Sequence, residues 1–285
     1  MVQNAPHTLL IRESFALYEE FAQAVEGWEL DFCQISPSNG DFFLEQLAGT
    51  DALISRAFFP STFLQRGCST PGYRTVSILC SGDHTEYWRW CGEAVTRNSL
   101  LVMPVGGEFE SISMPRFDSI HLALPVEKLE QIAEQHFDVP LYQLMPDERC
   151  FCPHGGAPLL ALRRLLESVT SGPGGGNCSL RLSPDLETEL AYRVLACLEQ
   201  NGAVRPRGPR GKRRRVLEGA LAIIENTPVA EQDAVQLATA TGVSRRTLEN
   251  AFRDGLGVSP AAYIKARRLC GLARDLYRGD DGSVR

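Results

Sequence analysis

Polar side chains of the types that contact nucleic acid are concentrated in residues 245–253. They are Arg245, Arg246, Glu249, Asn250 and Arg253. Arginine can pair with the two major-groove acceptors of guanine, asparagine can pair with adenine, and glutamate can accept a hydrogen bond from cytosine. Between these positions lie apolar residues at helical spacing, so the polar set is expected on the outer face of one helix. Such a face is able to enter a major groove.

The residues around this face have the spacing of a helix-turn-helix. A small residue, Ala238, suits the close approach of two helices, and Gly242 can take the positive φ that a tight turn requires. Ser244 is a good N-cap for the second helix. Apolar residues that would anchor the two helices are Leu237, Val243, Leu248, Ala251 and Phe252. The alternative interpretation of this segment is an ordinary helical hairpin with a solvated charged face.

The charge of the chain is divided unevenly. Residues 205–285 carry 16 basic and 9 acidic side chains, a net charge of +7, whereas residues 1–204 carry 13 and 26, a net charge of −13. A basic domain attached to an acidic body is typical of a chain in which one part meets a polyanion. This distribution favours nucleic-acid binding over the ordinary hairpin.

The segment 242–276 closely resembles the first half of the AraC/XylS-type DNA-binding domain. The matching positions are Leu237-Ala238, Gly242-Val243-Ser244, Leu248, Phe252, Leu256-Gly257, Ser259-Pro260, Tyr263, Arg268-Leu269 and Ala273-Arg274. The sequence departs from that family in two ways. No second helix-turn-helix unit follows the linking helix, and Asn250 stands where relatives commonly carry arginine.

The resemblance implies a transcription regulator, of the activator kind, that binds double-stranded DNA as a homodimer and contacts RNA polymerase. It places Arg246, Glu249 and Asn250 where relatives read bases, and we expect Arg245 and Arg253 to contact phosphates. The missing unit leaves an alternative from another class: a truncated dimerisation or interaction module without specific DNA binding.

The N-terminal half of the chain has the pattern of a β-rich domain. Short apolar or alternating runs separated by turn residues predict a sandwich or cupin-like barrel over 28–124, and helical periodicity follows over 126–201. A short amphipathic helix is expected at 14–26. The predicted organisation is α+β, with an effector-sensing and dimerisation domain (1–204), a linker (205–211) and a helix-turn-helix domain (212–285).

Similarity to the sensor domains of the same family, in particular a subgroup that includes ethanolamine-operon regulators, is suggested by two short segments. These are the residues from Phe21 to Trp28 and the run Gln65-Arg66-Gly67. The resemblance implies that the N-terminal domain responds to a small molecule.

Trp88 and Trp90 alternate on a predicted strand and therefore share one face. Aromatic rings on the inside of a barrel can bind a small-molecule effector. The alternative is that both rings are simply part of the hydrophobic core.

An apolar stripe at four-residue spacing marks a predicted helix near the end of the N-terminal domain. It consists of Leu186, Leu190, Val194 and Leu198. Such a stripe either packs on its own domain or forms a dimer seam.

The remaining patterns argue against other classes of protein. No apolar run is long enough to span a membrane, and no secretory signal is visible, so we expect a cytoplasmic protein. The run Cys150-Phe151-Cys152-Pro153-His154 lacks the spacing of a zinc site, and no phosphate-binding loop or catalytic triad stands out. We therefore expect no cofactor, no metal and no enzymatic activity, and a barrel enzyme is the least favoured alternative.

Overall fold

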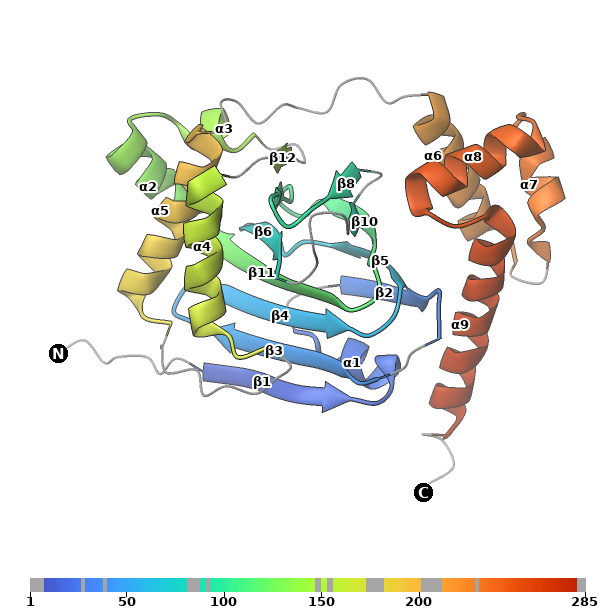
Figure 1. The fold of residues 1–285 in the computed structure, drawn as a ribbon, viewed down its shortest axis with the longest axis horizontal. Coiled ribbons are helices and arrows are strands. Elements are labelled where there is room, and N and C mark those ends of the chain that lie inside the picture. Colours follow the sequence, from blue (N-terminus) through green and yellow to red (C-terminus); the bar gives the residue numbers. More distant parts are fainter. Residues whose placement is uncertain are drawn as a thin grey trace.

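The fold is that of a computed structural model of the 285-residue chain. It describes residues 8–26, 29–37, 40–80, 88–90, 93–146, 150–152, 156–172, 182–200, 212–228 and 231–280. Strands dominate the first half and helices the second (Figure 1). The predicted α+β class is confirmed.

Two antiparallel sheets form the N-terminal domain. The larger sheet has the order β1 (Thr8–Phe15), β3 (Phe42–Ala48), β4 (Leu53–Phe59), β11 (Phe117–Pro125), β6 (Tyr73–Leu79), β9 (Leu100–Val102) and β12 (Cys150–Cys152). The smaller sheet has the order β2 (Glu29–Gln34), β5 (Phe63–Cys68), β10 (Glu108–Ile112), β7 (Trp88–Trp90) and β8 (Glu93–Val95). Aromatic side chains contributed by both sheets pack into one core, together with Tyr18 and Phe21 of α1 (Tyr18–Ala24).

The central strands of the larger sheet are buried on both faces because their side chains alternate between two cores. In β11, Phe117 belongs to the aromatic core, whereas Ile120 and Leu122 belong to an aliphatic core on the opposite face. That second core is completed by α2 (Val126–Phe137), α3 (Leu141–Leu144), α4 (Gly156–Val169) and α5 (Pro184–Gln200). Figure 1 shows these helices together on the side of the molecule remote from the C-terminal helices.

Two N-terminal expectations need correction. Residues 14–26 do not form one helix, because Ser14 and Phe15 end strand β1 and the helix begins only at Tyr18. Pairing with β3 over nearly the whole of β1 outweighs the helical spacing of this short segment. The strand-rich part is therefore wider than 28–124: it starts at Thr8, and β12 lies inside the predicted helical range.

The leucine-rich stripe of α5 packs on its own domain. Leu190, Val194 and Leu198 are at most 1% exposed, and Leu186 packs partly buried against the same aliphatic core. Because α2 and α4 flank this helix, the stripe is not free to pair with a second copy. The dimer-seam interpretation of the stripe is wrong.

The described part of the C-terminal domain contains the helices α6 (Lys212–Asn226), α7 (Ala234–Ala240), α8 (Arg245–Leu256) and α9 (Pro260–Asp280). Their apolar faces meet in a third core, which also contains Cys33, Leu64 and Ile112 from the smaller sheet. The helical domain is therefore packed directly against the outer face of that sheet.

We predict that His121 makes the stability of the fold depend on pH. It sits on β11 with Nδ1 2.7 Å from Ser77 Oγ and Nε2 3.0 Å from Ser119 Oγ, and burial lowers the pKa of His121 from 6.5 to about 4. The unfolded chain therefore takes up a proton at this site before the folded chain does, so stability is full above pH 6.5 and falls between about pH 6.5 and 4.

The check is a series of urea unfolding curves at neutral and mildly acidic pH. His121→Gln should lose less stability than the wild type on acidification, whereas His136→Gln, on α2 at the surface, should follow the wild type. Equal losses for His121→Gln and the wild type would contradict the assignment.

Candidate nucleic-acid interface

The turn between α7 and α8 has the backbone geometry that the sequence predicted. Gly242 adopts φ +65°, its N–H donates to the Thr239 carbonyl (3.1 Å), and the Val243 N–H donates to the Ala238 carbonyl (3.2 Å). An added Cβ at Gly242 would meet no atom within 4 Å. Glycine is therefore required here by its backbone conformation rather than by crowding.

Side chains at the helix ends fix where α7 and α8 begin. The Asp233 carboxylate accepts from the Val235 N–H (2.9 Å) at the start of α7, and Ser244 Oγ accepts from the Thr247 N–H (3.2 Å) at the start of α8. Gly257, with φ +74°, ends α8. The N-cap role of Ser244 is thus confirmed, whereas the Asp233 cap is an addition that the pattern of an acidic residue before an apolar run could have indicated.

The inner face of α8 anchors it in the domain core. Leu248 and Phe252 are fully buried, and the rings of Phe252 and Tyr263 pack edge to face with centroids 5.6 Å apart. Leu237 and Ala238 of α7 are buried in the same core, and Val243 packs against it. Burial also raises the pKa of Tyr263 to about 12, so this phenol stays neutral inside the core.

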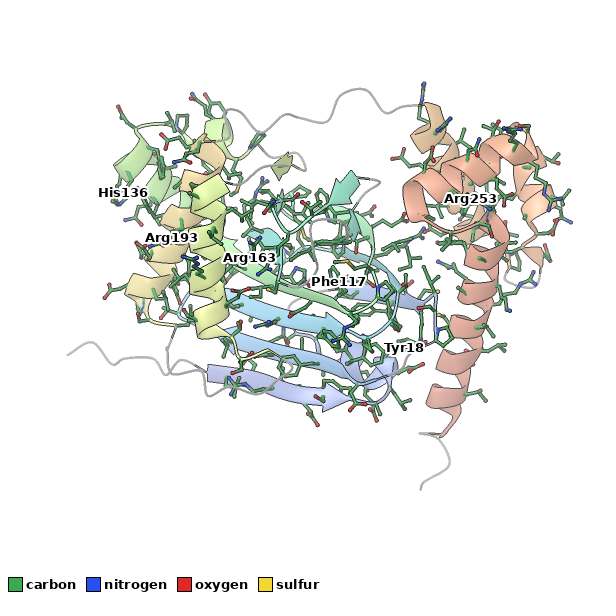
Figure 2. All side chains as sticks on the ribbon, in the orientation of Figure 1. Tyr18, Phe117, His136, Arg163, Arg193 and Arg253 are labelled. Atoms are coloured by element: carbon green, nitrogen blue, oxygen red, sulfur yellow. The ribbon has the colours of Figure 1, made fainter. Side chains whose placement is uncertain are left out.

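The outer face of α8 carries the predicted polar residues. Arg245, Arg246 and Arg253 are exposed, while Glu249 and Asn250 are partly buried. Positions 246, 250 and 253 follow one another at the four- and three-residue spacing that keeps side chains on one face. Figure 2 labels Arg253 on this helix.

One ion pair lies along the polar face. Glu249 is 4.0 Å from Arg253, and both side chains are accessible to solvent. An exposed pair one helical turn apart is weak, so it leaves the Arg253 guanidinium able to turn toward a phosphate.

The first turn of α6 adds positive charge to the same domain. Lys212 and Arg213 open this helix, and Arg213 is 65% exposed even though it pairs with Asp254 of α8. The pair links the start of α6 to α8. Positive charge therefore extends beyond the polar face of α8.

The helical domain is fixed to the smaller sheet by polar contacts that the sequence did not reveal. The Gln34 N–H at the outer edge of β2 donates to Cys270 Sγ of α9 (3.1 Å), and the Cys270 thiol approaches the Gln34 carbonyl. A hydrogen bond with Cys270, followed in importance by burial, raises the pKa of Cys33. The Cys33 thiol therefore remains protonated in the interface.

Arg66 of β5 is the second polar link. Its guanidinium pairs with Glu110 of β10 at 2.8 Å and with Glu225 of α6. The side chain is only 16% exposed, so the pairs are partly shielded from water. Arg66 belongs to the run Gln65-Arg66-Gly67, one of the two segments that suggested similarity to sensor domains. The role of Arg66 as an interdomain contact could not be deduced from that run.

Trp88 and Trp90 lie inside the sandwich, where they are 1% and 2% exposed. The Trp88 ring packs edge to face on Phe117 at 5.0 Å. Neither indole N–H donates a hydrogen bond within the described structure, and Gln65 Nε2 and Thr75 Oγ1 are likewise buried there without a hydrogen-bond partner. The two rings are thus core residues that also present unused donors.

Metal binding finds no support in the described ranges. Within them, no group of three or more His, Cys, Asp and Glu side chains is arranged to bind a metal ion. The side chains of the run Cys150 to His154 lie outside the described residues. Among the described helices, none combines the length and the apolar character needed to span a bilayer.

Comparison with known proteins gives similarity in structure only. No family model and no curated protein matches the chain. Among solved structures, the AraC-like transcriptional activator CuxR is 16% identical with a TM-score of 0.46, over 93% of this chain and 95% of that one. ToxT from Vibrio cholerae strain SCE256, with a bound unsaturated fatty acid, is 10% identical with a TM-score of 0.36, over 83% and 84%.

A second ToxT structure, from Vibrio cholerae O395, is 6% identical with a TM-score of 0.30, over 86% of this chain and 81% of that one.

Replacing Phe252 tests whether this core holds the polar face in place. Phe252→Ala should destabilise the C-terminal domain by about 3–5 kcal/mol, because a fully buried aromatic ring is lost from a small core. Val235→Ala, at a position 55% exposed on α7, is the matched control and should change stability by less than about 0.5 kcal/mol. Chemical unfolding of the full chain measures both, and similar values for the two variants would contradict the packing.

Proposed function

We propose that this chain is a sequence-specific DNA-binding regulator of transcription. The observation that carries the proposal is the outward row of Arg246, Asn250 and Arg253 on α8, a helix capped at both ends and anchored by buried residues. A recognition helix needs this combination, because its polar side chains must reach base edges from a rigid support. The net charge of +7 over residues 205–285 supports the same conclusion.

Within this proposal the five polar residues have two kinds of role. Arg246, Glu249 and Asn250 contact base edges, and Arg245 and Arg253 contact phosphates. The assignment rests on the resemblance in sequence and on the accessibility of these side chains in the structure. RNA polymerase is a further partner that only the resemblance suggests.

The N-terminal domain is proposed to bind a small-molecule effector between its two sheets. Support comes from the unpartnered Trp88 Nε1, Trp90 Nε1 and Gln65 Nε2, since buried donors without acceptors are costly unless a water or a ligand satisfies them. Three N–H donors favour a ligand that offers acceptor oxygens.

The smaller sheet would connect that site to the DNA-binding domain. Neighbouring residues on its strands face opposite ways: Phe32 and Phe63 belong to the aromatic core, while Cys33 and Leu64 belong to the core shared with the C-terminal helices. A ligand that displaces these strands therefore changes the surface on which α6 and α9 rest. This is the proposed route from effector to DNA.

Arg246→Ala should weaken binding to the preferred DNA site by about 1–3 kcal/mol and relax the preference at one base position. Arg253→Ala should weaken binding to all sequences about equally and reduce the salt dependence, because a phosphate contact carries no sequence information. Selection of binding sites from random duplexes, with titrations at several salt concentrations, measures both effects.

The control for charge alone is Arg193→Ala on α5, far from α8, which should leave the selected motif and the affinity unchanged. A full chain that binds no duplex above the level of a non-specific protein would reject the proposed function. An unchanged motif for Arg246→Ala would reject only the assignment of bases.

Effector binding should be visible through the tryptophans. The full chain is titrated with a panel of polyols, amides and carboxylates, and binding is followed by intrinsic tryptophan fluorescence. We expect at least one oxygen-rich compound to shift the tryptophan emission. Trp90→Phe keeps an aromatic ring but removes Nε1, so it should weaken that compound's binding by about 0.5–1.5 kcal/mol, the net value of one hydrogen bond. Equal affinity of Trp90→Phe and wild type, measured by calorimetry, would contradict the proposed site.

A further inference from the structure

The second half of α9 presents a row of leucines to solvent. Leu269, Leu272 and Leu276 are 55%, 61% and 75% exposed, and their three- and four-residue spacing places them on one face. The opposite face, with Tyr263, Ala266 and Cys270, is buried. In Figure 1 this part of α9 continues past α6, α7 and α8 toward the C-terminus.

This row is unusual for a helix that already has one buried side. Scattered exposed leucines need no explanation, but an aligned row on a rigid helix marks an interaction surface. The first half of α9 is anchored, since Cys270 is bound to the edge of β2 and Tyr263 packs on Phe252. The row therefore extends outward from an interface that is already fixed.

We propose that the face formed by Leu269, Leu272 and Leu276, here called the α9 leucine face, pairs antiparallel with the same face of a second copy of this chain. The proposal rests on the proposed function in one respect: the distance between two recognition helices selects the direction of pairing. It replaces the α5 stripe, whose leucines are buried, as the dimer contact.

The length of α9 fits two adjacent half-sites. Pro260, where α9 begins just after α8, lies twelve residues before Leu272, or about 18 Å at 1.5 Å per residue. A two-fold axis at Leu272 therefore separates the starts of the two α9 helices by about 36 Å. Half-sites one helical turn apart are separated by about 34–36 Å, whereas parallel pairing would bring the two starts within about 10 Å.

Charge on the flank of the leucine face also favours the antiparallel direction. Arg268 and Asp275 are both exposed and lie seven residues apart, on the same side of the face. Antiparallel pairing about Leu272 brings Arg268 of one copy beside Asp275 of the other, whereas parallel pairing places the two copies of this flank on opposite sides of the seam and forms no such pair. The Arg268 guanidinium also donates to the carbonyl of Gln232, two residues before α7 begins.

Association through this face is expected to be weak in free solution. Three leucines from each copy cover less than the roughly 800 Å² per partner of a standard interface. Two copies bound to neighbouring half-sites meet at high effective concentration, so the contact acts mainly as cooperativity on DNA.

The first test is sedimentation of the full chain without DNA, up to its highest soluble concentration. The wild type is expected to show a concentration-dependent dimer, and Leu272→Glu should lower the association constant about tenfold or more, because two carboxylates meet at the axis. Leu160→Glu, at a position 43% exposed on α4, is the matched control and should associate like the wild type. A wild-type monomer at every concentration, or an unaffected Leu272→Glu dimer, overturns the proposal.

The second test fixes the direction of pairing. Under mild oxidation, Leu272→Cys should form an interchain disulfide well above the wild-type background, while Leu276→Cys, about 12 Å from its symmetry mate along the axis, should not. Equal cross-linking of both variants indicates parallel pairing and overturns the proposal. Because neither test contains DNA, a dimer that binds no duplex contradicts the proposed function alone, and a monomer that binds DNA contradicts the pairing alone.

Discussion

The arrangement of the whole chain depends on the smaller sheet, which packs against a hydrophobic core on each of its two faces. Strands β2, β5 and β10 place Phe32, Phe63 and Phe109 in the aromatic core and Cys33, Leu64 and Ile112 in the core shared with α6 and α9. Because the alternation has a period of two, a slip of one residue in any of these strands would exchange the two sets. The fold of the N-terminal domain and the position of the C-terminal helices are thus specified by the same register.

Local signals were sufficient to predict the helix-turn-helix. Gly242, Ser244 and Gly257 act through their own backbone and nearest neighbours, so a single sequence contains nearly all the information that determines them. The anchors Leu248 and Phe252 follow from helical periodicity. Which outward residues touch bases depends on a partner molecule, and the assignments of Arg246, Glu249 and Asn250 stay predictions.

Non-local contacts account for what could not be predicted. Residues 14–26 have helical spacing, but the pairing of β1 with β3, more than twenty residues away, takes the first part of that segment into a sheet. The four-residue spacing of the apolar stripe on α5 is the same whether the stripe is buried under α2 and α4 or pairs with a second copy, so the sequence could not distinguish the two. The contacts of Arg66 with Glu225 and of Gln34 with Cys270 join residues from different domains. No local pattern in the sequence indicates that the two residues of either pair lie close together.

Charge gives a physical reason for the orientation of the C-terminal helices. The N-terminal part carries a net charge of −13 and would repel a DNA backbone brought close to it. Packing α6 and α9 against the sheet places the third core between the acidic domain and α8, whose main contacts are with α6, α7 and α9. The polar face of α8 is therefore held outward by the same hydrophobic interface that joins it to the N-terminal domain. Under the proposed function, loosening that interface changes both the orientation of α8 and the repulsion between the acidic domain and DNA.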